Sequence, residues 1–171
     1  NHFIMKKLIY SLFCCLFILS AHAQWKWHNP MDAGFPVVQN QGFVNEIGKT
    51  YTRLPERVKE DVNKTLWGLS QHSSGLAIHF YSNAPKIQVR YKVTGKNYSM
   101  PHMPSTGVSG VDLYQINCDG QAAFCFGTYS FKDTIVYTYN NIKKDKYHNY
   151  GYEYRLYLPL YNGVQWLEIG T

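Results

Sequence analysis

Alternating apolar and polar residues mark most of the chain from Leu76 onward. In the clearest run, residues 86–93, every second side chain is apolar: Ile87, Val89, Tyr91 and Val93. This period of two is typical of a β-strand with one face in a core. Further strands are predicted, with turn residues between them, over 76–80, 111–118, 122–126, 134–139, 150–158 and 164–169.

The segment 111–118 differs from the other predicted strands because it is apolar on both faces. Leu113 lies on one face, and Tyr114 and Ile116 lie on the other. Such a strand is central in its sheet or covered on its second face. Asp112 would then lie near the core, where an isolated carboxylate is very costly. We expect the backbone amides of the preceding Gly/Ser loop to bind it.

Only one segment has helical spacing. Its apolar residues are Val58, Val62, Leu66 and Leu69, and Pro55 suits a first helical turn. We therefore predict one short helix near residues 56–69. About seven or eight short strands without βαβ alternation favour an all-β fold, an antiparallel β-sandwich of jelly-roll type.

The first 23 residues predict an export signal. Two lysines precede the apolar stretch 8–19, which is too short to span a bilayer, and Ala21-His22-Ala23 fits a cleavage site. Met5 is the expected start, with residues 1–4 upstream of it. Residues 24–171 are then expected to form one domain, exported to the periplasm or the extracellular space, with no membrane span after signal cleavage.

The charge of the chain points to no nucleic-acid partner. Lysine and arginine number 17 against 11 aspartates and glutamates, for a formal net charge of +6. Most of these cations are scattered along the chain, and the one basic cluster, residues 143–146, is typical of a solvated loop. A binding face for nucleic acid needs a concentrated basic patch.

The two cysteines after the signal are not predicted to pair. Residues 119–120, Asp-Gly, favour a two-residue hairpin in which Cys118 pairs with Gln121 and Cys125 lies opposite Tyr114. In that register the two sulfurs share a face but lie too far apart for a disulfide. We expect two buried thiols.

No catalytic or metal-binding motif is complete. Residues 107–110 begin like the G-x-S-x-G elbow around Ser109, but Val111 replaces the last glycine and a strand follows where the elbow needs a helix. Ser73 follows His72 in sequence, which does not place a base within its reach. The five histidines after residue 23 lack the spacing of a zinc site. We predict no catalytic residue, metal or cofactor.

The many tyrosines leave a carbohydrate-binding interpretation open. Nine of the fifteen lie within residues 129–161. Several continue the parity of Leu156 and Leu158, which assigns them to the core with their hydroxyls at its edge. The tyrosines that remain free for a ligand are Tyr147, Tyr157 and Tyr161.

Residues 100–104, Met-Pro-His-Met-Pro, form a loop held by two prolines. Exposed methionines are adaptable contact residues. The segment is either a plain surface loop or a contact loop that presents His102 to a partner or a substrate pocket. The residues alone do not decide between the two.

Residues 110–114, Gly-Val-Asp-Leu-Tyr, match the signature of the GxDLY family, the N-terminal domain found ahead of SGNH (GDSL-type) hydrolases. Gly110, Asp112, Leu113 and Tyr114 are its structural motif. The segments 69–76, 84–91, 100–109 and 166–170 also resemble this family, so the resemblance covers residues 25–171.

The resemblance implies an accessory domain of a secreted esterase, lipase or acylhydrolase, with acylated carbohydrates or lipids as candidate substrates. In that family a catalytic domain follows, with its serine near the start and an Asp-x-x-His block near the end. Neither block is recognised here, so we interpret the chain as truncated, with its C-terminal catalytic domain missing.

The domain is expected to pack on that catalytic domain and border its active site. The candidate rim residues are His72, Ser73, Met100, His102, Met103 and Ser109. A stand-alone carbohydrate-binding module is the alternative.

Overall fold

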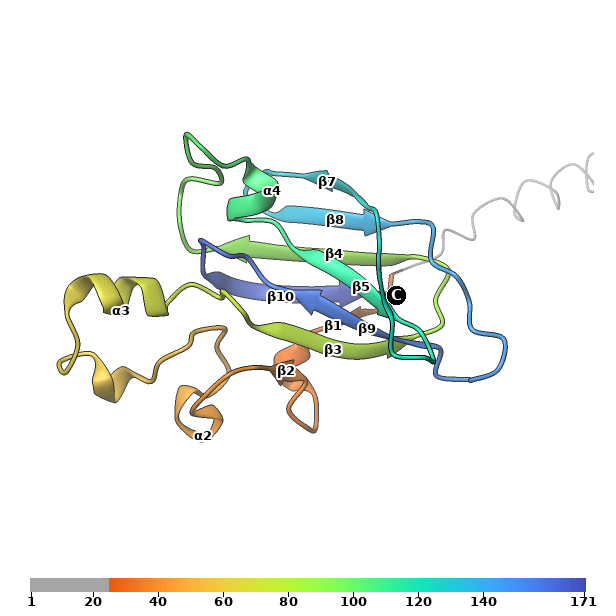
Figure 1. Cartoon of the computed structure of the whole chain (residues 1–171), viewed down its shortest axis with the longest axis horizontal. Coiled ribbons are helices and arrows are strands. Elements are labelled where there is room, and N and C mark those ends of the chain that lie inside the picture. Colours follow the sequence, from red (N-terminus) through yellow and green to blue (C-terminus); the bar gives the residue numbers. More distant parts are fainter. Residues whose placement is uncertain (1–24) are drawn as a thin grey trace, which may run out of the picture.

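The computed structural model describes residues 25–171 (Figure 1), so the predicted signal lies outside the described residues. Two five-stranded sheets pack face to face, and all strand pairs are antiparallel. The predicted all-β sandwich is confirmed.

The first sheet, sheet A, has the order β1-β10-β4-β8-β7, and the second, sheet B, has the order β2-β3-β9-β5-β6. The strands of sheet A are β1 (Trp27–His28), β4 (Ile87–Val93), β7 (Thr128–Ser130), β8 (Ile135–Tyr139) and β10 (Val164–Gly170). Those of sheet B are β2 (Val38–Gln39), β3 (Ala77–Ser82), β5 (Asp112–Ile116), β6 (Ala122–Phe124) and β9 (Tyr152–Tyr157).

The core lies between the two sheets and follows the predicted alternation. In β4 the four apolar residues noted above are buried and the intervening residues are half-buried. From sheet B, Leu113 and Leu156 are fully buried against them. Burying such a side chain stabilises the fold by about 1.5–3 kcal/mol.

Within residues 25–171, five short helical segments lie outside the sheets: η2 (Pro30–Asp32), α2 (Val44–Ile47), η3 (Glu56–Val58), α3 (Lys64–Ser70) and α4 (Ser105–Val108). The helix predicted near residues 56–69 is present in two parts, η3 and α3. Asn63 separates them, because its backbone is extended and its side chain accepts a 2.8 Å hydrogen bond from the Leu66 amide. This is an N-cap, which starts a new helix.

The hairpin between β5 and β6 differs from the predicted one by one residue. Asn117, not Cys118, pairs with Gln121, because the loop has three residues and Gly120 adopts a φ of +80°. Cys118 is therefore exposed in the loop and Cys125 is half-buried; both are free thiols. The expectation of two buried thiols is wrong for Cys118.

Within residues 25–171, none of the helices has the length and apolar character needed to cross a bilayer.

Candidate interdomain surface

Residues 110–114 begin at a tightly packed glycine. Gly110 joins α4 to β5, and a Cβ atom there would collide with the backbone carbonyl of Thr106 and lie 2.5 Å from the hydroxyl of Tyr137. The hydroxyl of Tyr91 donates a 2.7 Å hydrogen bond to the carbonyl of the preceding residue, Ser109. Two tyrosines of sheet A thus surround the start of β5, and only glycine fits between them.

Beyond Gly110 the side chains point alternately inward and outward. Leu113 is fully buried between the sheets, whereas Asp112 is exposed and Tyr114 is half-buried on the outer face of sheet B. No loop amide among the described residues donates to Asp112, so the predicted buried carboxylate is wrong. With apolar groups on both faces of β5, the inward face could not be chosen from sequence. Partial desolvation raises the pKa of the Asp112 carboxyl.

A hollow of about 350 Å³ lies on this outer face. Its walls are Asp112 and Tyr114 from β5, Arg155 and Tyr157 from β9, and Leu160 beyond them. In the sheet register Asp112 lies opposite Tyr157, and Tyr114 lies opposite Arg155. The hollow combines a carboxylate, a guanidinium and two phenol rings. A ligand or partner that binds here can form polar contacts with the charged groups and apolar contacts with the rings around them.

Arg155 and His79 meet on the same face. They are cross-strand neighbours, and both lie near Glu153, whose Oε1 is 3.3 Å from Arg155 Nε and 3.6 Å from His79 Nδ1. Desolvation and the nearby Arg155 lower the pKa of His79, and they outweigh the opposing effect of Glu153. The carboxylate of Glu153 accepts its hydrogen bond from Arg155, and His79 lies farther from it.

The loop predicted to make contacts is a compact turn next to α4. Met100 and Met103 exchange two backbone hydrogen bonds, 2.9 and 3.1 Å, and this bridge leaves Pro101 and His102 exposed at its tip. Met100 also lines a hollow of about 400 Å³ together with His72. Two of the predicted rim segments are thus brought together, at the end of the sandwich that carries α3 and α4 (Figure 1).

His72 is half-buried at this end. Desolvation, with a smaller contribution from Arg53, lowers its pKa. This shift favours the neutral form of the imidazole.

The two serines of the predicted rim are fully buried. The hydroxyl of Ser73 donates to the carbonyl of Tyr51 at 2.9 Å and accepts from the amide of Val164 at 3.0 Å. The hydroxyl of Ser109 accepts a 3.0 Å hydrogen bond from the side-chain amide of Asn162. Both hydroxyls join strands and loops within the domain, and neither reaches its surface.

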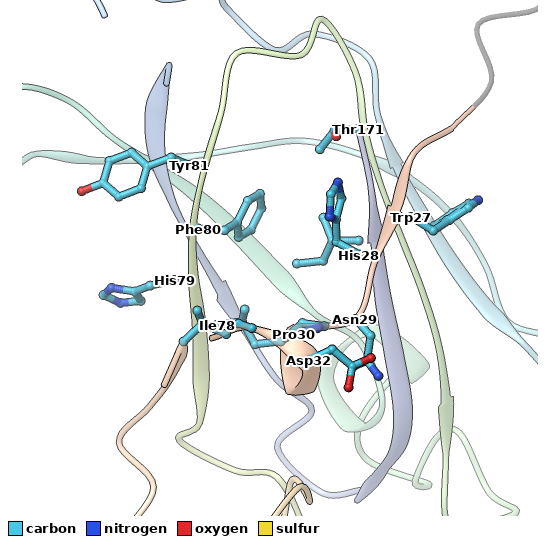
Figure 2. Close-up of a pocket in the computed structure, with 13 residues that line it drawn as sticks. Trp27, His28, Asn29, Pro30, Asp32, Ile78, His79, Phe80, Tyr81 and Thr171 are labelled. Carbon is cyan, nitrogen blue, oxygen red and sulfur yellow. The ribbon is translucent and has the colours of Figure 1, made fainter. Parts of the chain in front are cut away.

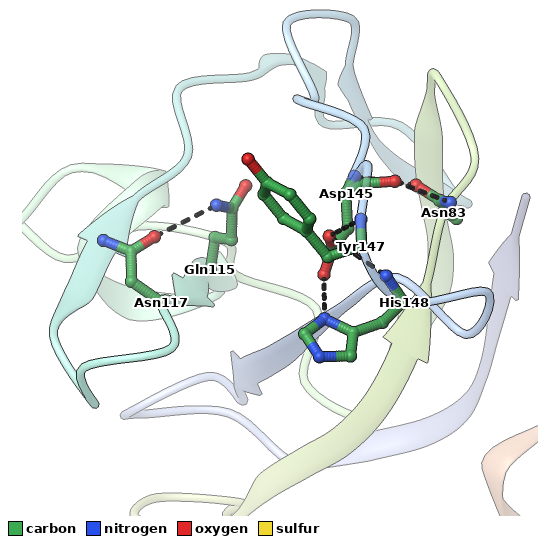
Figure 3. Close-up of polar contacts among 6 residues, drawn as sticks. All are labelled: Asn83, Gln115, Asn117, Asp145, Tyr147 and His148. Atoms are coloured by element: carbon green, nitrogen blue, oxygen red, sulfur yellow. Dashed lines mark hydrogen bonds and ion pairs between the residues drawn. The ribbon is translucent and has the colours of Figure 1, made fainter.

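One polar cluster has no counterpart in the sequence predictions (Figure 3). His148 Nδ1 lies 2.7 Å from Asp145 Oδ2, and the backbone amide of Tyr147 donates to Asp145 Oδ1 at 2.7 Å. Asn83 holds the backbone of Asp145 through two hydrogen bonds. The amide of Tyr147, followed by the ring of His148, lowers the pKa of Asp145.

The sequence signal for this pair is the Asp-x-x-His spacing of residues 145–148, which was not recognised among the motifs above. No hydroxyl or thiol among residues 25–171 forms a hydrogen bond with His148. The pair therefore anchors the loop between β8 and β9 and has no nucleophile in contact.

A further hollow, of about 500 Å³, was not predicted either. It lies where β1 and β10 of sheet A face β3 of sheet B (Figure 2). His28 and Phe80 line it from these two sides, and Thr171 lies at its border together with Tyr81. Within residues 25–171, no group of three or more metal-ligating side chains comes together in this hollow or elsewhere.

The comparisons with known proteins fit this geometry. The model of the GxDLY family, described as the N-terminus of SGNH hydrolase-type esterases, matches residues 25–171. The chain belongs to the GxDLY family. Among solved structures, a protein from Bacteroides ovatus described as a GDSL-like lipase has the same fold, with a TM-score of 0.73 and 25% sequence identity.

The match with the Bacteroides ovatus protein covers 86% of this chain but only 41% of the other. This GxDLY chain thus spans about two fifths of the length of its structural relative. No curated protein matches it. The family description places a GxDLY domain ahead of an SGNH hydrolase, which implies a C-terminal catalytic domain.

Proposed function

We propose that this chain is the accessory N-terminal domain of an exported SGNH-type serine esterase. The family match over residues 25–171 carries the proposal, and the 41% coverage of the GDSL-like lipase supports it. The domain provides a rigid β-sandwich on which the catalytic domain packs. The nucleophile, base and oxyanion donors belong to the catalytic domain, and the substrate is an ester of a carbohydrate or a lipid.

The turn of residues 100–104 borders the active site of the catalytic domain in this proposal. The exposed His102, held at the tip of a hydrogen-bonded turn, supports this role. A group positioned by such a turn loses little conformational freedom when it meets a substrate.

The test is His102→Ala in the protein that carries both domains, with Gln165→Ala, an exposed position of β10, as the control. We expect His102→Ala to lower kcat/KM for an aryl ester by about tenfold, the loss of a contact of about 1.4 kcal/mol, with Tm unchanged. Unaltered kinetics of His102→Ala would show that this turn does not border the active site.

A stand-alone carbohydrate-binding module is the second candidate, and the exposed aromatic rings favour it. Phe124 is 44% exposed, Phe126 81% and Tyr157 38%. Calorimetric titration of the 171-residue chain with acetylated oligosaccharides separates the two functions. Saturable binding favours the module, and its absence favours the accessory domain.

A further inference from the structure

The two sheets differ in the chemistry of their outer faces. On sheet A, polar side chains are paired with each other. Arg90 Nε lies 2.6 Å from Glu168 Oε2, Lys92 binds Asp133 at 2.7 Å, and Gln88 donates to Thr138 at 2.8 Å. Arg90 also covers the ring of Trp27 in the edge strand β1, with its guanidinium carbon 3.8 Å from the ring centroid. The face is therefore mainly polar, as is usual for the solvated side of an antiparallel sheet.

The outer face of sheet B carries an aromatic cluster instead. Tyr114 contacts Tyr157 and Phe124, with ring centroids 5.7 and 5.4 Å apart, and Phe124 contacts Phe126 at 4.9 Å. Leu160, 52% exposed, lies at the border of the same hollow. Contiguous exposed apolar groups with a polar rim mark an interaction site.

The residues of the GxDLY signature divide between the inside and the outside of the domain. The fold accounts for Gly110, which fits between α4 and the tyrosines, and for Leu113, which fills the core. Asp112 and Tyr114 point outward, and the side-chain carboxylate of Asp112 forms no hydrogen bond or ion pair with any other residue in 25–171. The packing of the domain thus accounts for Tyr114, which contacts Phe124 and Tyr157, but it gives no partner to the carboxylate of Asp112.

Thr171, the last residue of the family match, lies close to this face. Thr171 borders the hollow of Figure 2 together with His79 and Tyr81. Both of these β3 residues belong to the outer face of sheet B, because they alternate with the inward-facing Ile78 and Phe80. A domain that follows the family match in sequence therefore begins beside the edge of this face.

The geometry of the rings disfavours a sugar as the occupant. The Tyr114–Tyr157, Tyr114–Phe124 and Phe124–Phe126 pairs are edge-to-face, with interplanar angles of 89°, 68° and 87°. Rings in this arrangement form an uneven apolar surface and not the flat platform that a pyranose ring stacks on. Such a surface suits the interdigitating side chains of another protein domain.

We propose that the outer face of sheet B is the docking surface for the C-terminal SGNH-type domain of the same polypeptide, with Asp112 accepting hydrogen bonds from a cationic or amide donor of that domain. This inference rests on the proposed function. Tyr114, Phe124 and Tyr157 supply the apolar contact around Asp112. The start of β5 is joined directly to α4, so the same docking places residues 100–109 at the border between the domains.

Hydroxyl-radical footprinting of the two-domain protein tests the proposal, because both candidate surfaces carry reactive side chains. The oxidation rates of four side chains report on the outer face of sheet B: Tyr114, Phe124, Phe126 and Tyr157.

The end that carries α3 and α4 is reported by Trp67, Met100 and Met103. The reference side chain, expected to stay unprotected, is Tyr147, which is 90% exposed. We expect Phe126 and Tyr157 to be oxidised several-fold more slowly than their exposure in this domain predicts, while Tyr147 reacts fully.

Each other outcome contradicts a different part of the account. Protection confined to Trp67, Met100 and Met103 would overturn the docking face and leave the accessory function standing. Full reactivity of both surfaces would contradict interdomain packing altogether. Protection of Phe126 and Tyr157 that arises only on addition of acetylated oligosaccharide would assign the face to a carbohydrate.

A charge variant provides a second measurement. Asp112→Lys, an exposed change, is expected to leave the sandwich folded but to split the thermal unfolding of the two-domain protein into two transitions. Gln165→Lys, at an exposed position of β10 in sheet A, is the control and should keep the wild-type profile. An identical profile for both variants would contradict a role of Asp112 in docking.

Discussion

The hydroxyl of Tyr91 in sheet A donates a 2.7 Å hydrogen bond to the backbone carbonyl of Ser109, directly before the GxDLY signature. Tyr91 is fully buried, and desolvation raises the pKa of its hydroxyl far above the ordinary value, so it remains a donor at every accessible pH. This contact couples the core of sheet A to the residue that links α4 to the signature, three residues before β5 and its proposed docking face.

Tyr91→Phe should therefore destabilise the domain. The substitution leaves the Ser109 carbonyl without this donor, and we expect the free energy of unfolding to fall by about 1–3 kcal/mol. Tyr139→Phe is the matched control, since the Tyr139 hydroxyl is equally buried but has no hydrogen-bond partner within residues 25–171. Chemical denaturation should show that change to be neutral or stabilising. Equal losses in both variants would contradict the assignment.

Gly110→Ala tests the packing at the start of the signature. The new methyl group would meet the Thr106 carbonyl, a backbone atom that cannot rotate away. We expect a loss of about 3 kcal/mol or more, the upper range for an overpacked core. Gly68→Ala in α3 is the control. Its Cβ meets open space, and removing a helical glycine should stabilise by about 0.5–1 kcal/mol. A Gly110→Ala domain of wild-type stability would disprove the close packing.

Ser73 and Ser74, which follow α3, should differ in how much stability is lost when each is replaced by alanine. Ser73→Ala removes both a donor to Tyr51 and an acceptor for the amide of Val164, both buried. We expect a loss of about 1–3 kcal/mol, because the partner groups stay buried and unsatisfied. Ser74→Ala, which removes no hydrogen bond found in residues 25–171, should change stability by less than about 0.5 kcal/mol. Similar values for the two variants would show that Ser73 is not a structural link.

The Asp145–His148 loop gives a pH dependence of defined sign. The pKa of Asp145 is lowered in the folded chain, so its carboxylate stabilises the fold above about pH 4, the unfolded value. This contribution is lost as the pH falls through the lowered folded pKa. The stability difference between wild type and Asp145→Asn should thus be largest near neutrality and vanish toward pH 2. Asp61→Asn, at an exposed position, is the control. A difference that stays constant with pH would refute the assignment.

The strands and the sandwich could be predicted because a period of two has few alternative explanations. β4 follows its predicted alternation residue by residue. The helix was predicted as one piece because the spacing of its apolar residues continues across Asn63 and gives no sign of the N-cap there. The hairpin register was missed by one residue because Asp-Gly suits both two-residue and three-residue loops.

The candidate site was harder to predict, because it depends on which face of a strand turns inward. Asp112 was placed inside from the pattern of β5, and only the packing of Leu113 against sheet A shows that it points outward. The buried hydroxyls of Ser73 and Ser109 are structural, whereas sequence adjacency to His72 and to the signature placed them at a rim. Pairings over long sequence distances, such as Asn83 with Asp145, leave no local signal.

Ester hydrolysis by the protein that carries residues 25–171 together with the proposed catalytic domain decides whether this chain is an accessory esterase domain. We predict hydrolysis of p-nitrophenyl acetate that depends on a serine of the catalytic domain and falls at least about tenfold when residues 25–171 are removed. Full activity of the catalytic domain alone, or no esterase activity together with saturable oligosaccharide binding by residues 25–171, would contradict this function.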